Sequence, residues 1–404
     1  MIIKKISTLL CISAIFFVSC AKDYGMDISP DSPYKETADD SPMSPPGTQN
    51  GTPGEPGKVT AAEWNDLDHW AFWCNLMTAD KSDQEGGNYT GMPDYWRFYT
   101  DRRVSIHVTD AQGNNLNDVK VELASDGNTI WTARTDVFGK AECWVGLYDR
   151  SAEAGQLSVS LNGVRQEMEP KITSWSLPTP EVNEYVFSAD APSYLADIMF
   201  IVDATGSMSD EIEFLKADLM DILNKVSSSS LSTSIRTAAL FYRDEGDAYV
   251  TRCSGFTSSY AATINFISDQ TASGGGDYPE AVHTALETSL QEFSWSSSAR
   301  ARIAFMLLDA PPHQDRTGVI GSLQRSIEAY AAQGIKLIPV ASSGVDKNTE
   351  FVLRFFATAT GGTYVFITND SGIGNKHIAA SVGQYEVEFL NDLLVRLITK
   401  YIGS

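Results

Sequence analysis

From about residue 193 onward, short apolar runs alternate with segments in which apolar residues recur every three or four positions. Uninterrupted apolar runs such as Ile198–Val202 are typical of strands buried on both faces of a parallel sheet, and the longer spacing is typical of helices with one buried face. The expected strands are 197–202, 237–242, 302–308, 336–341 and 363–367, and the expected helices are 210–226, 261–268, 279–292, 321–333, 349–358 and 385–401. This alternation predicts a doubly wound α/β domain over residues 194–402, with helices on both faces of a mostly parallel sheet.

Residues 102–190 have a different pattern, in which apolar residues occupy every second position, as in Val104, Ile106 and Val108. This period is typical of half-buried strands, and turn-forming sequences such as 110–114 separate the stretches. The pattern predicts a small all-β sandwich. It resembles the immunoglobulin-like and carboxypeptidase regulatory-type domains found beside surface domains, so we expect a spacer or interaction module.

Residues 59–101 form an aromatic-rich segment that we expect to be helical, because Thr60 to Glu63 matches the capping box at a helix N-terminus. Its aromatic side chains have two interpretations. They form either a stacking platform for carbohydrate or the apolar face that packs the helix on the next domain, and we favour packing. The residues concerned are Trp64, Trp70, Phe72 and Trp73.

The N-terminal residues have the order of a secretory signal peptide. Lys4 and Lys5 precede an apolar run, and the end of the predicted signal peptide, residues 1–19, resembles the lipobox of bacterial lipoproteins. There the following cysteine, here Cys20, becomes the lipid-bearing N-terminus. Residues 20–58 are rich in Ser, Pro, Gly and Asp and predict a disordered tether. The pair after Cys20, Lys22-Asp23, resembles tether signals of surface-exposed lipoproteins in the Bacteroides group, so we expect an outer-membrane lipoprotein at the cell surface.

The 404-residue chain has a net charge of -22, which argues against nucleic acid as a partner because phosphate binding requires clustered Lys and Arg. Beyond the N-terminus, no apolar stretch is long enough to predict a transmembrane helix. The cysteines after Cys20 are far apart and odd in number, so they predict neither a disulfide framework nor a zinc site.

Oxygen-bearing side chains follow the first expected strand of the α/β domain. Asp203, Thr205 and Ser207 alternate along the loop between that strand and the next helix. Open α/β sheets place their sites at the carboxyl ends of strands. A carboxylate and two hydroxyls are hard donors, which favour Mg²⁺ over a soft transition metal.

This loop resembles the first motif of the metal-ion-dependent adhesion site in the von Willebrand factor type A family, with Thr205 at a position where that family has serine. Two further stretches extend the resemblance over residues 194–402: three glycines precede Asp277, and the strand 302–308 is followed by Asp309. The resemblance implies that Mg²⁺ (or Mn²⁺ or Ca²⁺) is held by Asp203, Thr205, Ser207, Asp277 and Asp309, with Asp203 and Asp309 acting directly or through water.

Three other acidic residues near these loops have open interpretations. Glu280 is either a further ligand or a residue that complements the dipole of the helix it begins. Asp244 and Asp247 either form a second cation site, steer a ligand by their charge, or belong to a solvated acidic turn, and we favour the turn.

The resemblance implies a non-catalytic protein in which the metal binds an acidic side chain of a protein partner. One alternative is an envelope assembly scaffold whose metal only stabilises the fold. Another is a metal-assisted hydrolase with His313 or Glu280 as its base. A serine hydrolase built from Ser207, His313 and Asp309 is disfavoured, because the serine is not on a Gly-x-Ser-x-Gly elbow.

Cys20 gives the first testable prediction. Lipid labelling of intact cells should follow the protein and vanish in the Cys20→Ser variant, because only this cysteine follows the basic and apolar regions in the order that lipid attachment requires. Labelling that survives the substitution would refute the assignment.

Overall fold

The computed structural model describes residues 59–78, 88–177, 179–229, 233–369 and 379–403. The predicted signal peptide, Cys20 and the tether lie outside these ranges. In the described ranges, no helix has the length and apolar character needed to cross a membrane.

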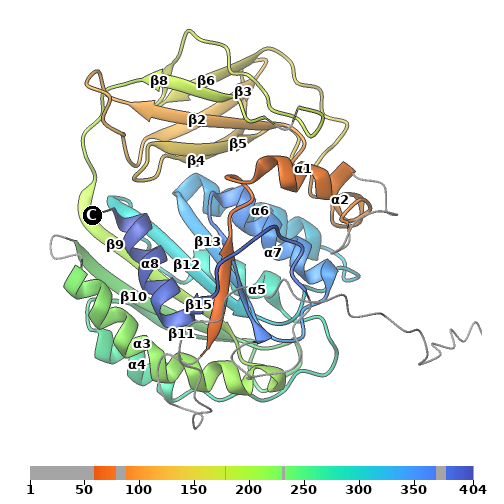
Figure 1. The fold of residues 1–404 in the computed structure, drawn as a ribbon, viewed down its shortest axis with the longest axis vertical. Coiled ribbons are helices and arrows are strands. Elements are labelled where there is room, and N and C mark those ends of the chain that lie inside the picture. The colour runs from red at the N-terminus through yellow and green to blue at the C-terminus, as the bar shows by residue number, and fades with distance from the viewer. Residues whose placement is uncertain (1–58, 79–87, 178, 230–232, 370–378, 404) are drawn as a thin grey trace, which may run out of the picture. The chain divides into compact units, whose positions relative to one another are not determined.

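An eight-stranded sheet organises the described residues (Figure 1). In spatial order its strands are β11 (Thr251–Thr257), β10 (Ser234–Tyr242), β9 (Ser193–Asp203), β12 (Ala299–Leu308), β13 (Ile335–Ala341), β14 (Tyr364–Ile367), β1 (Thr60–Trp64) and β15 (Glu388–Phe389). The strands from β10 to β14 run parallel, and β11, β1 and β15 pair antiparallel to their neighbours. The prediction of a mostly parallel α/β sheet is confirmed, whereas the sequence pattern missed the antiparallel strands at its margins.

Helices cover both faces of this sheet. One face carries α3 (Ser209–Ser229), α4 (Tyr260–Ser268) and α8 (Leu390–Ile402), and the other carries α5 (Val282–Gln291), α6 (Val319–Gln333) and α7 (Lys347–Thr360). Along β9, Ile198 and Phe200 belong to the core under the first group, and Met199 and Ile201 belong to the core under the second. Because successive side chains of a strand point to opposite faces, burial on both faces requires the uninterrupted apolar run.

The prediction that a helix begins at Thr60 is wrong, because residues 60–64 form strand β1. This strand lies between β14 and β15, and Ala61 and Ala62 are fully buried there. Glu63, the residue expected to close the capping box, instead pairs with Arg396 of α8 at 2.9 Å. The capping box is a local pattern, and here the ladder to β14 satisfies the backbone groups that a helix would have used.

The tryptophan side chains of this segment are buried and Phe72 is partly buried, which confirms their packing role. Trp70 and Trp73 of α1 (Trp70–Thr78) are 1% and 0% exposed. The Trp73 ring lies parallel to that of Phe351 in α7, with 6.1 Å between centroids, and its indole N–H donates to the Thr100 hydroxyl at 2.8 Å. A short second helix, α2 (Met92–Trp96), continues this layer.

A buried ion pair joins the segment after β1 to α7. Arg354 is fully buried, and its Nε donates to Asp66 Oδ2 at 2.9 Å while its Nη1 donates to the Tyr89 hydroxyl at 3.1 Å. Breaking such a pair leaves an uncompensated buried charge, so this pair fixes the N-terminal segment on the α/β layer.

Two small sheets lie between this segment and β9 in the sequence. One contains β5 (Lys140–Trp144), β2 (Arg103–Thr109) and β8 (Val182–Val186), and the other contains β4 (Asn128–Arg134), β3 (Lys120–Ser125), β6 (Leu157–Leu161) and β7 (Val164–Arg165). Their inner residues share one core with α6 and α7. The Trp144 indole N–H donates to the Ala359 carbonyl at 3.3 Å, and the Tyr148 hydroxyl donates to the Gln324 carbonyl at 3.1 Å. The small sheets therefore pack directly on the helices of the larger sheet.

Candidate metal centre at the carboxyl edge of the sheet

Three neighbouring parallel strands end at the same edge of the large sheet. Asp203 ends β9, where it pairs in register with Tyr242 at the end of β10, and Asp309 directly follows β12 on the other side. Since the carboxyl ends of parallel strands meet at one edge, the register itself brings two of the predicted ligands together.

The loop after β9 is organised around the Asp203 side chain. Its Oδ1 accepts hydrogen bonds from the Thr205 amide at 2.9 Å and the Thr205 hydroxyl at 2.7 Å, and the hydroxyls of Thr205 and Ser207 lie 3.5 Å apart. A single turn, η1 (Gly206–Met208), then leads into α3. Asp203 and Thr205 are buried, whereas Ser207 is exposed. The three side chains therefore lie together, with Ser207 on the solvent side.

Burial leaves polar atoms of this group without partners. Asp203 Oδ2 and Asp309 Oδ1 are buried and have no hydrogen-bond partner among the described residues. The Tyr242 hydroxyl, close to Asp203, is likewise buried with no hydrogen-bond partner among the described residues. Burial and the charge of Asp309 raise the pKa of Asp203 to about 7. Burial also raises the pKa of Asp309, although a hydrogen bond from Ser207 opposes the rise.

Glu280 belongs to the same group. It is 3% exposed, its amide donates to the Pro311 carbonyl at 2.9 Å, and its Oε2 has no partner among the described residues. Burial raises the pKa of Glu280 to about 9, with further contributions from the charges of Asp203, Asp244, Asp309 and Asp247. Of the two sequence interpretations, this burial disfavours a residue that only complements a helix dipole, because α5 begins two residues later, at Val282.

Glu211 is a further acidic residue that the sequence did not identify. Its Oε1 accepts a hydrogen bond from the Ser343 hydroxyl at 2.8 Å, while its Oε2 is buried without a partner in the described part of the chain. Its pKa is raised, mainly by burial and in part by Asp309. Its position in the first turn of a helix made it look like an ordinary charge at a dipole end.

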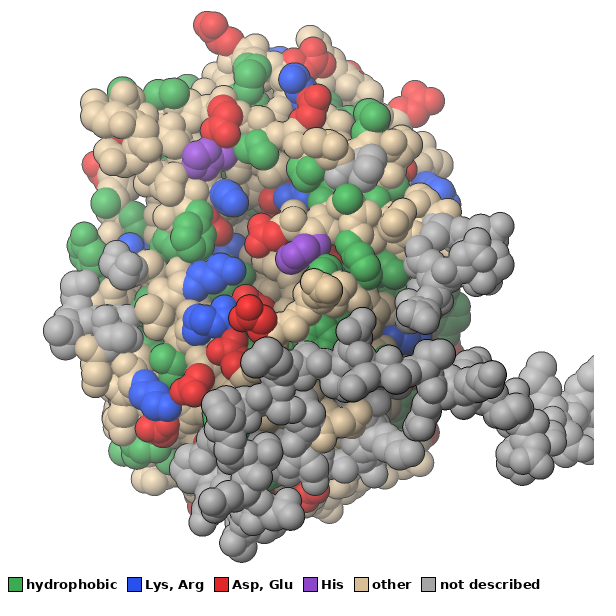
Figure 2. All heavy atoms as spheres, viewed as in Figure 1, with side chains coloured by type: hydrophobic (Ala, Val, Ile, Leu, Met, Phe, Trp, Pro, Cys, Tyr) green, Lys and Arg blue, Asp and Glu red, His purple; other side chains and the backbone are tan. Residues whose placement is uncertain are grey.

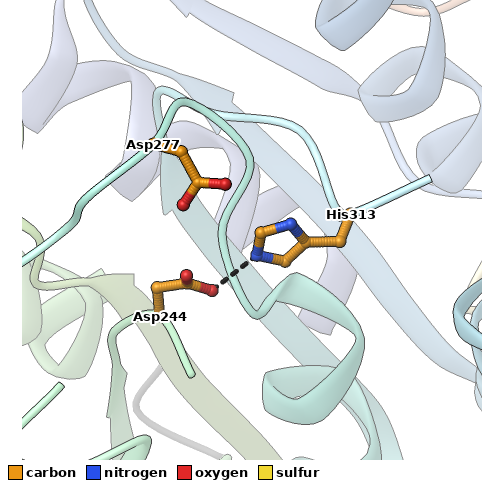
Figure 3. Close-up of side chains that lie close together, drawn as sticks. All are labelled: Asp244, Asp277 and His313. Carbon is orange, nitrogen blue, oxygen red and sulfur yellow. Dashed lines mark hydrogen bonds and ion pairs between the residues drawn. The ribbon is translucent and has the colours of Figure 1, made fainter. Parts of the chain in front are cut away.

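Asp277 lies in a second cluster, with Asp244 and His313 (Figure 3). The imidazole Nε2 of His313 is 2.6 Å from Asp244 Oδ1, and one ligand atom from each of the three residues lies within 4.8 Å of the others. Asp244 and His313 are buried, whereas Asp277 is exposed. These groups can hold a cation, and the structure thus places Asp277 beside His313, a neighbour that the sequence gave no reason to expect.

Asp247 has a structural role in the described chain. Its Oδ2 accepts hydrogen bonds from the Gly275 amide at 3.0 Å and from the Asp244 amide at 3.2 Å. It therefore joins the loop after β10 to the glycine-rich loop before α5. This contact supports the interpretation of Asp247 as part of a turn.

Comparison with known proteins agrees with this geometry. A parallel sheet with helices on both faces and acidic loops at its carboxyl edge defines an open α/β domain. Residues 197–369 match the family model described as von Willebrand factor A domain. The chain therefore contains a von Willebrand factor A domain.

The proteins that resemble this chain are similar to only part of it, and the two curated relatives are matched over less than a third of their own length. An ariadne-like RING finger protein of Acanthamoeba polyphaga mimivirus is 34% identical over 119 residues, which cover 30% of this chain and 11% of that protein. The alpha-protein kinase vwkA of Dictyostelium discoideum is 31% identical over 167 residues, which cover 41% of this chain and 26% of the kinase. The crystal structure of the conserved hypothetical protein BatB from Bacteroides thetaiotaomicron covers 52% of this chain and 100% of its own, at 13% identity and a TM-score of 0.35.

The glycine-rich loop gives a prediction about how closely these groups pack. Gly275 has φ +75°, and a Cβ there would lie 2.9 Å from Glu280 Oε1 and 3.2 Å from Thr205 Cβ. We expect Gly275→Ala to destabilise the protein by about 1–3 kcal/mol in urea denaturation, because it combines a left-handed backbone with a close approach.

Gly276→Ala is the matched control, since a Cβ at Gly276 meets nothing within 4 Å. It should change the free energy of unfolding by no more than about 0.5 kcal/mol. Equal effects of the two substitutions would contradict the packing described for this loop.

Proposed function

We propose that the von Willebrand factor A domain of this chain binds a divalent cation at the carboxyl edge of its sheet and uses it to bind a protein partner. One observation carries the proposal: Asp203, Glu280 and Asp309 are buried together, and each has a carboxylate oxygen with no partner among the described residues. Buried carboxylates are normally paired or bound to metal, because an isolated buried charge is costly.

The donor set fits Mg²⁺ or a related hard cation. Carboxylates and hydroxyls are the oxygen ligands that Mg²⁺, Mn²⁺ and Ca²⁺ prefer. In this proposal Asp203, Asp309, Thr205 and Ser207 hold the ion. Its positive charge would offset the mutual repulsion of the carboxylates and would attract an anionic group of a partner.

For the fifth ligand, the geometry favours a different residue from the one that the sequence predicted. Asp277 was the candidate from the sequence, but Glu280 is the carboxylate that is buried with Asp203 and Asp309. We therefore assign Glu280 to the ion, and Asp277 to the cluster with Asp244 and His313.

The partner in this proposal is a protein that offers an acidic side chain, as the resemblance to adhesion-type domains implies. Exposure of Ser207, at the solvent side of the cluster, supports an accessible ion. The named activities of the kinase and the RING finger protein belong to those proteins, with which this chain shares only the segments given above.

We further propose that the domain is non-catalytic. His313 is 1% exposed and its Nε2 is occupied by Asp244. In the described chain, Ser207 makes no hydrogen bond to a histidine nitrogen, so the nucleophile and base of a serine hydrolase are not paired. A buried, occupied imidazole is also poorly placed to activate water for a hydrolase.

The cellular setting of the proposal follows from the sequence. A protein lipidated at Cys20 and carried on a tether would present the domain at the cell envelope, most simply at the outer-membrane surface. The small sheets, of the proposed immunoglobulin-like or carboxypeptidase regulatory-like type, would act as a spacer or a further interaction module.

Metal affinity tests the ligand set. In calorimetric titration with Mn²⁺ we expect Asp203→Ala to abolish binding at this centre and Glu280→Gln to weaken it by roughly tenfold or more, because a contact to a charged group contributes about 1.5–3 kcal/mol. Asp277→Asn is the matched control and should stay within about threefold of the parent protein.

Other ligand sets would give different changes in Mn²⁺ affinity. Unchanged affinity in Asp203→Ala would end the proposal of a cation at this centre. Strong loss in Asp277→Asn with little change in Glu280→Gln would restore the ligand set predicted from the sequence. Circular dichroism of each variant checks that the sheet persists.

Partner capture tests the function. Envelope proteins retained by the immobilised full chain in Mg²⁺ should be released by a chelator, and Asp203→Ala should capture none of them, because the ion would form the contact. A partner that remains bound in chelator would favour the assembly scaffold, in which the metal only stabilises the fold.

A further inference from the structure

A cavity of about 390 Å³ lies where the small sheets meet the amino-terminal edge of the large sheet. Its walls come from the starts of β12 and β13, the end of α8, and strands β4 and β5. Figure 2 shows Lys, Arg, Asp and Glu side chains gathered around a hollow on this face. Because the parallel strands begin here, the cavity is at the sheet edge opposite the metal centre.

The cavity lining is rich in positive charge. The chain as a whole has 30 Lys and Arg against 52 Asp and Glu, but the lining has seven basic residues against four acidic ones. The basic residues are Arg103, Arg134, Lys140, Arg300, Arg302, Lys336 and Lys400. An excess of three positive charges in a strongly acidic protein raises the local concentration of anions.

Four of these cations are held by carboxylates of the same lining. Their ion pairs are Arg103 with Glu142 at 2.7 Å, Arg134 and Arg302 with Asp118 at 3.2 and 3.0 Å, and Lys336 with Asp136 at 3.0 Å. Asp118 thus joins an arginine of the small sheets to an arginine of the large sheet. These pairs give the cavity walls a defined shape.

The other three cations have no carboxylate within ion-pair distance among the described residues: Lys140, Arg300 and Lys400. Arg300 lies 5.0 Å from the ring of Tyr194, and Lys400 lies 5.5 Å from the ring of Tyr401. Lys140 comes from the small sheets, and the other two come from the α/β domain. The three cations therefore line the cavity from both sides of the seam between the small sheets and the large sheet.

We propose that the cavity binds a small organic phosphate, a phosphate monoester, through Lys140, Arg300 and Lys400. A phosphate monoester carries a charge of about -1.5 to -2 and three acceptor oxygens, which matches three unpaired cationic donors better than a single carboxylate does. The volume lies in the range of small-molecule sites, at roughly 300–1,000 Å³, and exceeds the need of inorganic phosphate alone. Leu67, Phe138 and Ile303 add apolar wall for the organic part.

Binding at this seam has a structural consequence. The ligand would contact cations of the small sheets and of the α/β domain at once, and it would replace their repulsion by attraction. A ligand that binds only the folded protein also raises its stability. The phosphate monoester should therefore increase the unfolding temperature as well as bind.

The test uses glucose 6-phosphate as the probe, titrated calorimetrically into the full chain in metal-free buffer of constant ionic strength. We expect saturable binding of glucose 6-phosphate, no binding of glucose, and weaker binding of inorganic phosphate. Arg300→Gln and Lys400→Gln should each weaken binding by about tenfold or more, because each removes a charge-assisted contact. Lys216→Gln, whose lysine pairs with Glu213 on α3 outside the cavity, is the matched control and should bind as the parent does.

Each contrary result overturns a stated part of the proposal. If glucose 6-phosphate does not bind saturably, or if Arg300→Gln and Lys400→Gln both leave its affinity unchanged, the cavity is not the proposed binding site. If inorganic phosphate binds as tightly as glucose 6-phosphate, the site does not recognise the organic part of the ligand. Because these titrations contain no metal, they can fail or succeed independently of the proposed metal-dependent function.

Discussion

Three carboxylates buried at one edge of a parallel sheet are the constraint on which the site depends. Asp203 and Asp309 are placed by the ends of adjacent strands, and the Glu280 amide donates a hydrogen bond to the Pro311 carbonyl in the loop that follows Asp309. Burial raises the pKa of all three carboxyl groups, and the charges of neighbouring carboxylates raise the pKa of Asp203 and Glu280 further. A fold keeps such a costly arrangement when something of opposite charge compensates it, and no side chain of the described residues does so.

The loops around these carboxylates are fixed by contacts that leave little freedom. The Thr205 amide and hydroxyl hold one oxygen of Asp203, and Asp247 holds the amide of Gly275. Gly275 is needed because a side chain would enter the space of Glu280 and Thr205. The remaining carboxylate oxygens are therefore positioned before any ligand arrives, which lowers the cost of ordering the site on binding.

The N-terminal part of the described chain is integrated into the same fold. β1 pairs antiparallel to β14, so Thr60 lies at the carboxyl edge of the sheet, where its hydroxyl meets that of Thr368 at 2.8 Å. Arg354 and Asp66 then fix the following segment on α7. Strand β1 thus begins at the edge that carries the proposed metal centre, while the basic cavity lies at the opposite edge.

The sequence by itself determined the alternation of strands and helices in the α/β domain, because buried parallel strands require uninterrupted apolar runs and covering helices require one apolar face. It also predicted that Asp203, Thr205, Ser207 and Asp309 lie at or just after the ends of strands, since the end of a buried strand is visible as the point where the apolar run stops. The grouping of these residues at one edge then follows from parallel topology.

Only the tertiary structure decided the rest, because the deciding contacts join residues far apart in the sequence. Glu280 is buried by its pairing with the loop at Pro311, and Asp277 meets His313 across two loops. Residues 60–64 form a strand because they pair with β14, about 300 residues further along the chain. This pairing outweighs the local capping-box pattern, which predicted a helix. Periodicity reports the environment of one segment, and it contains no information about which distant segment supplies the partner.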